Sequence, residues 1–133
     1  MTFWRLTLVA MLAAFLAGCE SATVKSIQQD FKTLFQISKG AQDLADGIKQ
    51  YEDANYSEAA RLLQSSLDQG LGTNDQVKAH KYLAFINCVS GREQRCRDEF
   101  RAALKIDPSF ELAANEAGHP IWGPAFRSAK GRK

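Results

Sequence analysis

The segment FRAALKIDP, from Phe100 to Pro108, decides the fold of this 133-residue chain. Its apolar residues recur at the spacing of one helix face. Asp107-Pro108 then marks the start of a further helix, because proline is favoured at the first helical position. Toward the N-terminus, small residues precede the segment at fixed intervals. Together they form the series Ala84, Gly91, Cys96, Phe100, Ala103, Leu104 and Pro108, with spacings of 7, 5, 4, 3, 1 and 4 residues.

This spacing resembles that of the tetratricopeptide repeat, in which small residues let two paired helices approach closely. Cys96 stands where that family usually has alanine, and both residues are small. An earlier stretch matches less completely, with three extra residues in the connection around 70–74. Its matching residues are Gly47, Ala54, Tyr56, Ala59, Leu63 and Leu67. The resemblance implies an all-α fold in which residues 40–110 form two helical hairpins of a short solenoid.

A flanking N-terminal helix is predicted before the repeats. Apolar residues recur every three or four positions from Val24 to Phe35 and can be followed to Tyr51. We expect a break near Gly40, because glycine in a helix interior costs about 1 kcal/mol relative to alanine. Residues 19–39 then form one amphipathic helix. Capping boxes predict further helix starts at three pairs, Asn55 with Glu58, Thr73 with Gln76, and Ser90 with Glu93.

Residues 111–133 are expected to close the end of the solenoid. A helix that begins around Phe110 should stop near Gly118, because residues 118–124 contain two glycines and two prolines. Trp122 and Phe126 would fold back from this irregular segment onto the open core, with a partner-binding anchor as the alternative. The basic tail is either a solvated end or a contact for an acidic partner or anionic headgroups. It contains Arg127, Lys130, Arg132 and Lys133.

The first 18 residues have the layout of a signal peptide, with Arg5 ahead of about ten mostly apolar residues. They end in Leu16-Ala17-Gly18-Cys19, which resembles the processing site of bacterial lipoproteins. In that family the matching cysteine carries a diacylglycerol and a further acyl chain, and two or more chains anchor a protein stably. The alternative is a buried or membrane-spanning helix with a chance cysteine. Glu20 in place of aspartate implies the outer membrane, facing the periplasm, rather than the inner membrane.

Removal of residues 1–18 leaves 115 residues, enough for one small domain, with 16 basic and 15 acidic side chains. This balance provides no strong field to attract nucleic acid. With Cys19 lipidated, only Cys88 and Cys96 remain in an oxidising compartment. We expect a disulfide between them across the Ser90-Gly91 turn. If they are not bonded, both are expected to be small buried residues.

Catalytic signals are sparse in this chain. His80 and His119 are its two histidines, and we expect both to make structural hydrogen bonds. No HExxH, P-loop, GxSxG or zinc-ligand spacing is present. We therefore expect no enzyme activity, no metal, no cofactor beyond the lipid on Cys19, and no small-molecule substrate.

The concave face of stacked helical pairs is the expected binding surface for a protein partner. In the second repeat this face is mixed in character and suits a peptide with an acidic group, with Lys78, Lys81 and Phe85 as its main residues and Cys88 and Val89 beside them. The first-repeat positions are too apolar to remain exposed to water, and we expect the face of Phe31, Leu34 and Phe35 to cover them. Those positions are Ala41, Leu44, Ile48, Tyr51 and Glu52.

The lipoprotein processing site, the repeats and the closing segment GHPIWGPAFR (Gly118–Arg127) together resemble the TssQ family of lipoproteins associated with type VI secretion. The resemblance covers nearly the whole mature chain. It implies an accessory role in a contractile secretion machine, supporting envelope-spanning components from the periplasmic side. No binding residue can be carried over from that family. The alternatives are a repeat lipoprotein that assembles pili, secretins or outer-membrane proteins, and a peptidoglycan-associated protein.

Overall fold

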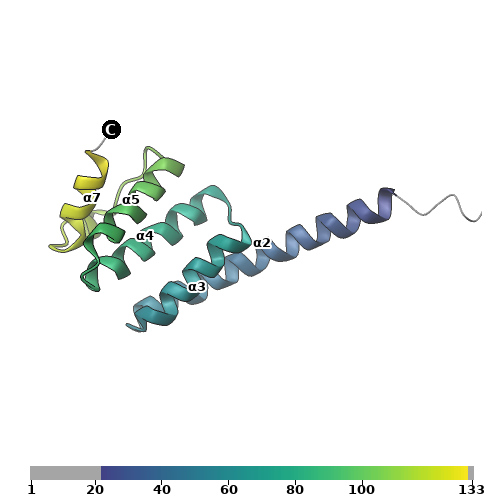
Figure 1. Cartoon of the computed structure of the whole chain (residues 1–133), viewed down its shortest axis with the longest axis horizontal. Coiled ribbons are helices and arrows are strands. Elements are labelled where there is room, and N and C mark those ends of the chain that lie inside the picture. The colour runs from purple at the N-terminus through teal and green to yellow at the C-terminus, as the bar shows by residue number, and fades with distance from the viewer. Residues whose placement is uncertain (1–21, 132–133) are drawn as a thin grey trace, which may run out of the picture. The chain divides into compact units, whose positions relative to one another are not determined.

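The computed structural model describes residues 22–131, so the expected signal peptide, Cys19 and the last two residues lie outside the described range. This range is all-helical, as predicted (Figure 1). By its internal contacts the chain divides within its first described helix, into a unit that ends at Phe35 and a unit that begins at Gln36. The helices are α2 (Ala22–Glu52), α3 (Tyr56–Gln69), α4 (Thr73–Val89), α5 (Glu93–Ile106), α6 (Ala114–Ala117) and α7 (Trp122–Lys130).

Close backbone contact holds the second half of α2 against α3. A side-chain carbon added at Gly47 would lie 2.9 Å from Cγ of Leu63, and one at Gly40 would lie 2.9 Å from the carbonyl oxygen of Gly70. The predicted break near Gly40 is therefore wrong, since α2 continues through it to Glu52. Glycine is needed at this position because no side chain fits there, and the packing offsets its low helix propensity.

The second hairpin is formed by α4 and α5, which pack against each other, while α4 also packs against α3. The small residues of the repeat pattern are buried at these contacts, with Ala59, Ala84 and Cys96 each 0% exposed. Gly91 in the connecting turn has a φ of 72°, a conformation that glycine adopts without steric cost. Cys88 and Cys96 are joined by the expected disulfide, with 5.1 Å between their Cα atoms.

The predicted capping boxes are not formed, although the turns lie within a few residues of the predicted positions. Thr73 is the first residue of α4, and the N-cap is Gly72. Ser90 is the C-cap of α4, not the N-cap of α5. Asn55 is the N-cap of α3, but its side-chain oxygen accepts no hydrogen bond from the helix backbone, and its amide donates to Oε1 of Gln50 at 2.9 Å. These helix ends are held by the packing of the hairpins rather than by side-chain caps.

Two expectations for the C-terminal segment are wrong. Pro108 begins no helix, because the backbone N–H of Ser109 donates to Oδ1 of Asp107 at 2.9 Å and closes a turn there. Trp122 is not in an irregular segment, because it is the first residue of α7. Pro124 falls in the first turn of α7, where a backbone N–H has no acceptor within the helix, so proline is tolerated there.

Two apolar clusters fill the unit that begins at Gln36, one among α2, α3 and α4 and the other among α4, α5 and α7. In the second cluster Phe126 packs edge-on against Phe100 and Phe110, with ring centroids 5.2 and 5.5 Å away. Trp122 stacks on Phe85 at 4.5 Å. These aromatic contacts place α7 over the end of the second hairpin.

Candidate protein-interaction site

The expected groove of the second repeat is occupied by the chain's own C-terminal segment. Phe85 is 2% exposed and packs under Trp122, so it is not a surface residue as expected. Lys81 forms an ion pair with Glu116 of α6 at 2.7 Å. Lys78 alone is exposed, and its ammonium lies 3.5 Å from the carboxylate of Asp75 on the same helix. The predicted residues are therefore brought together, but most of this face is covered.

Lys81 has its charge satisfied within the molecule. The side chains of Lys81 and Glu116 are only 18% and 19% exposed. The Lys81 ammonium also lies 4.9 Å from the ring centroid of Tyr82 and 5.6 Å from that of Phe85, which is within the range of cation–π attraction. The second carboxylate oxygen of Glu116 accepts a hydrogen bond from the backbone N–H of Ala113 at 3.0 Å. This ion pair fixes α6 on α4.

Aromatic contacts continue the same covered face. The indole Nε1 of Trp122 donates to the backbone oxygen of Glu116 at 3.0 Å, and the ring of His119 stacks on the Trp122 ring. The Tyr51 ring packs edge-on against Tyr82, with centroids 5.1 Å apart. Burial, together with neighbouring tyrosines and Glu116, raises the pKa of Tyr51 to about 12. Burial likewise raises the pKa of Tyr82. These phenols are therefore neutral at physiological pH.

The first-repeat positions do not form an open groove that needs a cover. Leu44 is buried in the cluster among α2, α3 and α4, while Ile48 and Tyr51 are half-buried against the same cluster. The expected covering residues Phe31, Leu34 and Phe35 are themselves 70%, 66% and 64% exposed. Ala41 and Glu52, which the family register assigned to the groove, are exposed on α2.

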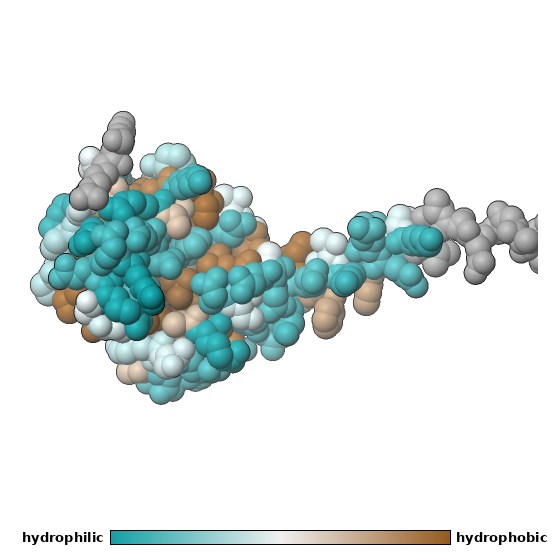
Figure 2. Space-filling view, in the orientation of Figure 1, coloured by the Kyte–Doolittle hydropathy of each residue, from teal (hydrophilic) through white to brown (hydrophobic). Residues whose placement is uncertain are grey.

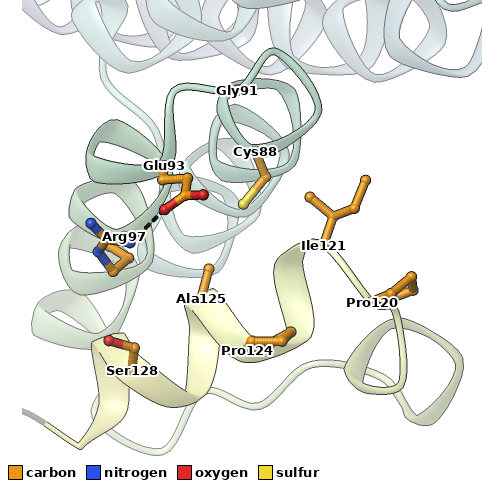
Figure 3. Close-up of a pocket in the computed structure, with 9 residues that line it drawn as sticks. All are labelled: Cys88, Gly91, Glu93, Arg97, Pro120, Ile121, Pro124, Ala125 and Ser128. Carbon is orange, nitrogen blue, oxygen red and sulfur yellow. Dashed lines mark hydrogen bonds and ion pairs between the residues drawn. The ribbon is translucent and has the colours of Figure 1, made fainter.

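A pocket of about 550 Å³ opens at the turn end of the second hairpin, between the disulfide-linked turn and α7 (Figure 3). Cys88 and Glu93 point toward Ala125 and Ile121 across this space. Pro120 and Ile121 form the turn before α7, so the Pro/Gly-rich segment shapes one wall. The lining residues are Cys88, Gly91, Glu93, Arg97, Pro120, Ile121, Pro124, Ala125 and Ser128.

The rim of this pocket combines apolar and charged groups. Ile121 is 49% exposed at this rim. Arg97 lies 3.5 Å from Glu93, and the Arg97 side chain is 25% exposed. The guanidinium of Arg97 also donates to Oε1 of Gln94 at 3.0 Å, so the pocket places an apolar residue near an ion pair.

The two histidines make the structural hydrogen bonds expected of them. Nδ1 of His80 lies 2.7 Å from Oε2 of Glu99 on α5. Nδ1 of His119 accepts a hydrogen bond from the backbone N–H of Ile121 at 3.2 Å. Within residues 22–131, no three side chains of His, Cys, Asp or Glu are grouped to hold a metal ion. None of the helices in that range has the length and apolar character to cross a membrane.

The sequence pattern did not single out Ile121, Arg97 or Glu116. The GHPIWGPAFR segment was the available signal, but its prolines and glycines indicated an irregular cap rather than the wall of a pocket. Glu116 lies 35 residues from Lys81, so no local pattern could pair them. No protein-family model, no curated protein and no solved structure was found to match this chain.

Proposed function

We propose that this protein is a non-enzymatic adaptor that binds a protein of the bacterial cell envelope. It is anchored through lipid on Cys19 to the outer membrane and faces the periplasm. Its role is that of an accessory lipoprotein in a type VI secretion system. The observation that carries the adaptor role is the pocket between the disulfide-linked turn and α7, with exposed Ile121 at its rim.

The pocket has the composition of a peptide-binding site. Protein interfaces are commonly centred on a few apolar anchors surrounded by polar groups that exclude water. Here the helices α4 and α5 form a rigid wall, since the disulfide and Phe100 hold them together. The opposite wall comes from α7 and the two prolines before and within it. A rigid pocket of this kind lowers the entropy lost when a partner segment binds.

The anchor and the secretion role are supported by the sequence. The Leu16-Ala17-Gly18-Cys19 site and the preceding apolar run support export and lipidation. The disulfide between Cys88 and Cys96 is consistent with an oxidising compartment. The resemblance to the TssQ family supports the choice of a secretion system over other envelope machines.

Site-specific photo-crosslinking in living bacteria tests this function. A crosslinking amino acid at position 121 should capture a component of the type VI apparatus, and one at exposed Lys105 on α5 should not. Capture of a pilus, secretin or outer-membrane assembly protein would overturn the secretion role in favour of an assembly factor. Adducts with peptidoglycan, or the same products from both positions, would overturn the pocket as the interaction site.

A matched pair of variants gives a second readout. Ile121→Asp should reduce secretion by the apparatus, because a carboxylate would replace the apolar anchor at the rim. Lys105→Asp is the control, since Lys105 is exposed on α5 and does not line the pocket. Both variants should keep the wild-type melting temperature. Equal secretion from the two variants would argue against a role for the pocket.

A further inference from the structure

An apolar stripe lies exposed along the first half of α2. Ile27, Phe31, Leu34 and Phe35 are 66%, 70%, 66% and 64% exposed. Figure 2 shows tan and brown side chains on this part of the helix beside the grey N-terminal residues, with teal ones around them. Scattered apolar residues are normal at a surface, but four neighbours on one helix face indicate an interaction surface.

A row of lysines runs beside this apolar stripe. Lys25, Lys32 and Lys39 are seven residues apart and therefore lie on nearly the same side of the helix. All three are exposed, and none forms an ion pair with another described residue. Asp30 is the one acidic residue between Lys25 and Lys39. The surface around the stripe is thus cationic.

The position of Cys19 limits where this surface can lie. Only Glu20 and Ser21 separate Cys19 from Ala22, the first residue of α2. At about 3.5 Å per residue, the chain spans no more than about 11 Å between Cys19 and Ala22. With lipid on Cys19, as in the proposed function, α2 begins at the membrane surface. The apolar stripe is then the nearest described part of the protein to the lipid.

We propose that residues 25–39 of α2 lie along an anionic membrane surface, with the apolar stripe in the boundary between headgroups and acyl chains. This inference rests on the lipid anchor of the proposed function. Helices with an aromatic and aliphatic face and lysines beside it bind membranes in this way. The long stems of the lysines let their ammonium groups reach lipid phosphates, so each lysine strengthens binding at an anionic surface.

A second copy of the chain fits the stripe less well than a membrane does. In a coiled coil, the seam of Ile27, Phe31 and Leu34 would continue at Ser38 and Ala41. It would therefore cover about two heptads, whereas a coiled coil is indicated by three or four. The flanking positions hold Gln28, Asp30, Phe35 and Ile37, which offer no pairs of opposite charge between two copies.

Tryptophan fluorescence of the acylated protein in lipid vesicles tests the proposal. Phe31→Trp places a reporter on the stripe, and Gln29→Trp places a matched reporter on the opposite face of the same helix turn. In vesicles with anionic phosphatidylglycerol and brominated lipids, the first reporter should shift to shorter wavelength and be quenched, and the second should not. Trp122 contributes equally to both proteins. Equal quenching of the two reporters would overturn the proposal, as would a stable dimer that protects Phe31→Trp from lipid.

A non-acylated mature chain separates failure of this inference from failure of the anchor. With Cys19→Ser and residues 1–18 removed, the chain should still bind phosphatidylglycerol vesicles, more weakly than the acylated form. Phe31→Ser combined with Leu34→Ser should reduce that binding about tenfold or more, and neutral vesicles or high salt should also reduce it. If the protein from cells carries no lipid on Cys19 but the non-acylated chain binds vesicles as described, the anchor alone would be refuted. Equal binding to neutral and anionic vesicles would refute the inference alone.

Discussion

Lys81 and Glu116 form an ion pair at 2.7 Å between α4 and α6, on the face that the repeat pattern assigns to a protein partner. The chain's own carboxylate thus takes the place expected for an acidic peptide. The proposed binding pocket beside Ile121 lies at the end of the same hairpin, between the disulfide-linked turn and α7.

A double-mutant cycle should show that the Lys81–Glu116 ion pair stabilises the fold. We expect Lys81→Met to lower the free energy of unfolding by about 1–3 kcal/mol, between the values for exposed and buried ion pairs. Combined with Glu116→Gln, the cycle should give a coupling energy above about 0.5 kcal/mol in urea unfolding. Lys78→Met is the control, and its exposed pair with Asp75 should contribute less than about 1 kcal/mol. Equal losses for Lys81→Met and Lys78→Met would contradict this.

Gly47→Ala should destabilise the protein although alanine is the better helix former. The added carbon would lie 2.9 Å from Cγ of buried Leu63, which cannot move aside in a packed core. Overpacking costs about 1–3 kcal/mol and outweighs a gain of about 1 kcal/mol in helix propensity. Gly118→Ala is the control, because no atom lies within 4 Å of the added carbon and the backbone is right-handed. Thermal unfolding that ranks Gly47→Ala at or above wild type would show that α2 and α3 are not in close contact.

The Cys88–Cys96 disulfide should stabilise the protein by about 2–3 kcal/mol, the value expected for a loop of about nine residues. Cys88→Ala, Cys96→Ala and the double variant should lose similar amounts, because the bond requires both sulfurs. Denaturant unfolding with and without reductant measures the effect. Thiol labelling of native protein without reductant should modify neither residue, and quantitative labelling of both would refute the bond.

The Tyr51 phenol should ionise at a higher pH than that of an ordinary tyrosine. Its pKa is raised from 10.0 to about 12 by burial, so the folded state favours the neutral phenol. The resulting stabilisation is fully present below pH 10, the unfolded value, and is lost as the pH rises toward 12. In a titration of phenolate absorbance, Tyr51→Phe should remove a step at high pH. A single step near pH 10 for every tyrosine, while circular dichroism remains native, would contradict the burial of Tyr51.

The repeat pattern predicted the hairpin core well because its constraints are local. Small residues at a helix contact must recur at helical spacing, and Ala59, Ala84 and Cys96 are all buried as their spacing indicates. The disulfide also followed from sequence, since a short turn brings nearby cysteines together. Such features depend on residues within one hairpin.

The errors concern contacts between residues far apart in the sequence. Helix propensity predicted a break at Gly40. In the structure the helix is continuous there, and the close contact of Gly40 with the backbone of Gly70 requires a glycine. The prolines on either side of Trp122 predicted an irregular segment. Pro124 is tolerated in a helix because α7 begins at Trp122, which places Pro124 in the first turn. The groove was predicted to be open, since nothing local shows that Glu116 and Trp122 cover it.

The proposed lipid on Cys19 would determine where both the pocket and the apolar stripe of α2 can act. Mass spectrometry of the N-terminal peptide, from protein purified out of bacterial membranes, measures this modification directly. We predict a peptide that begins at Cys19 and carries a diacylglycerol together with a further acyl chain. A peptide that begins at Met1, or an unmodified thiol on Cys19, would contradict the proposed function.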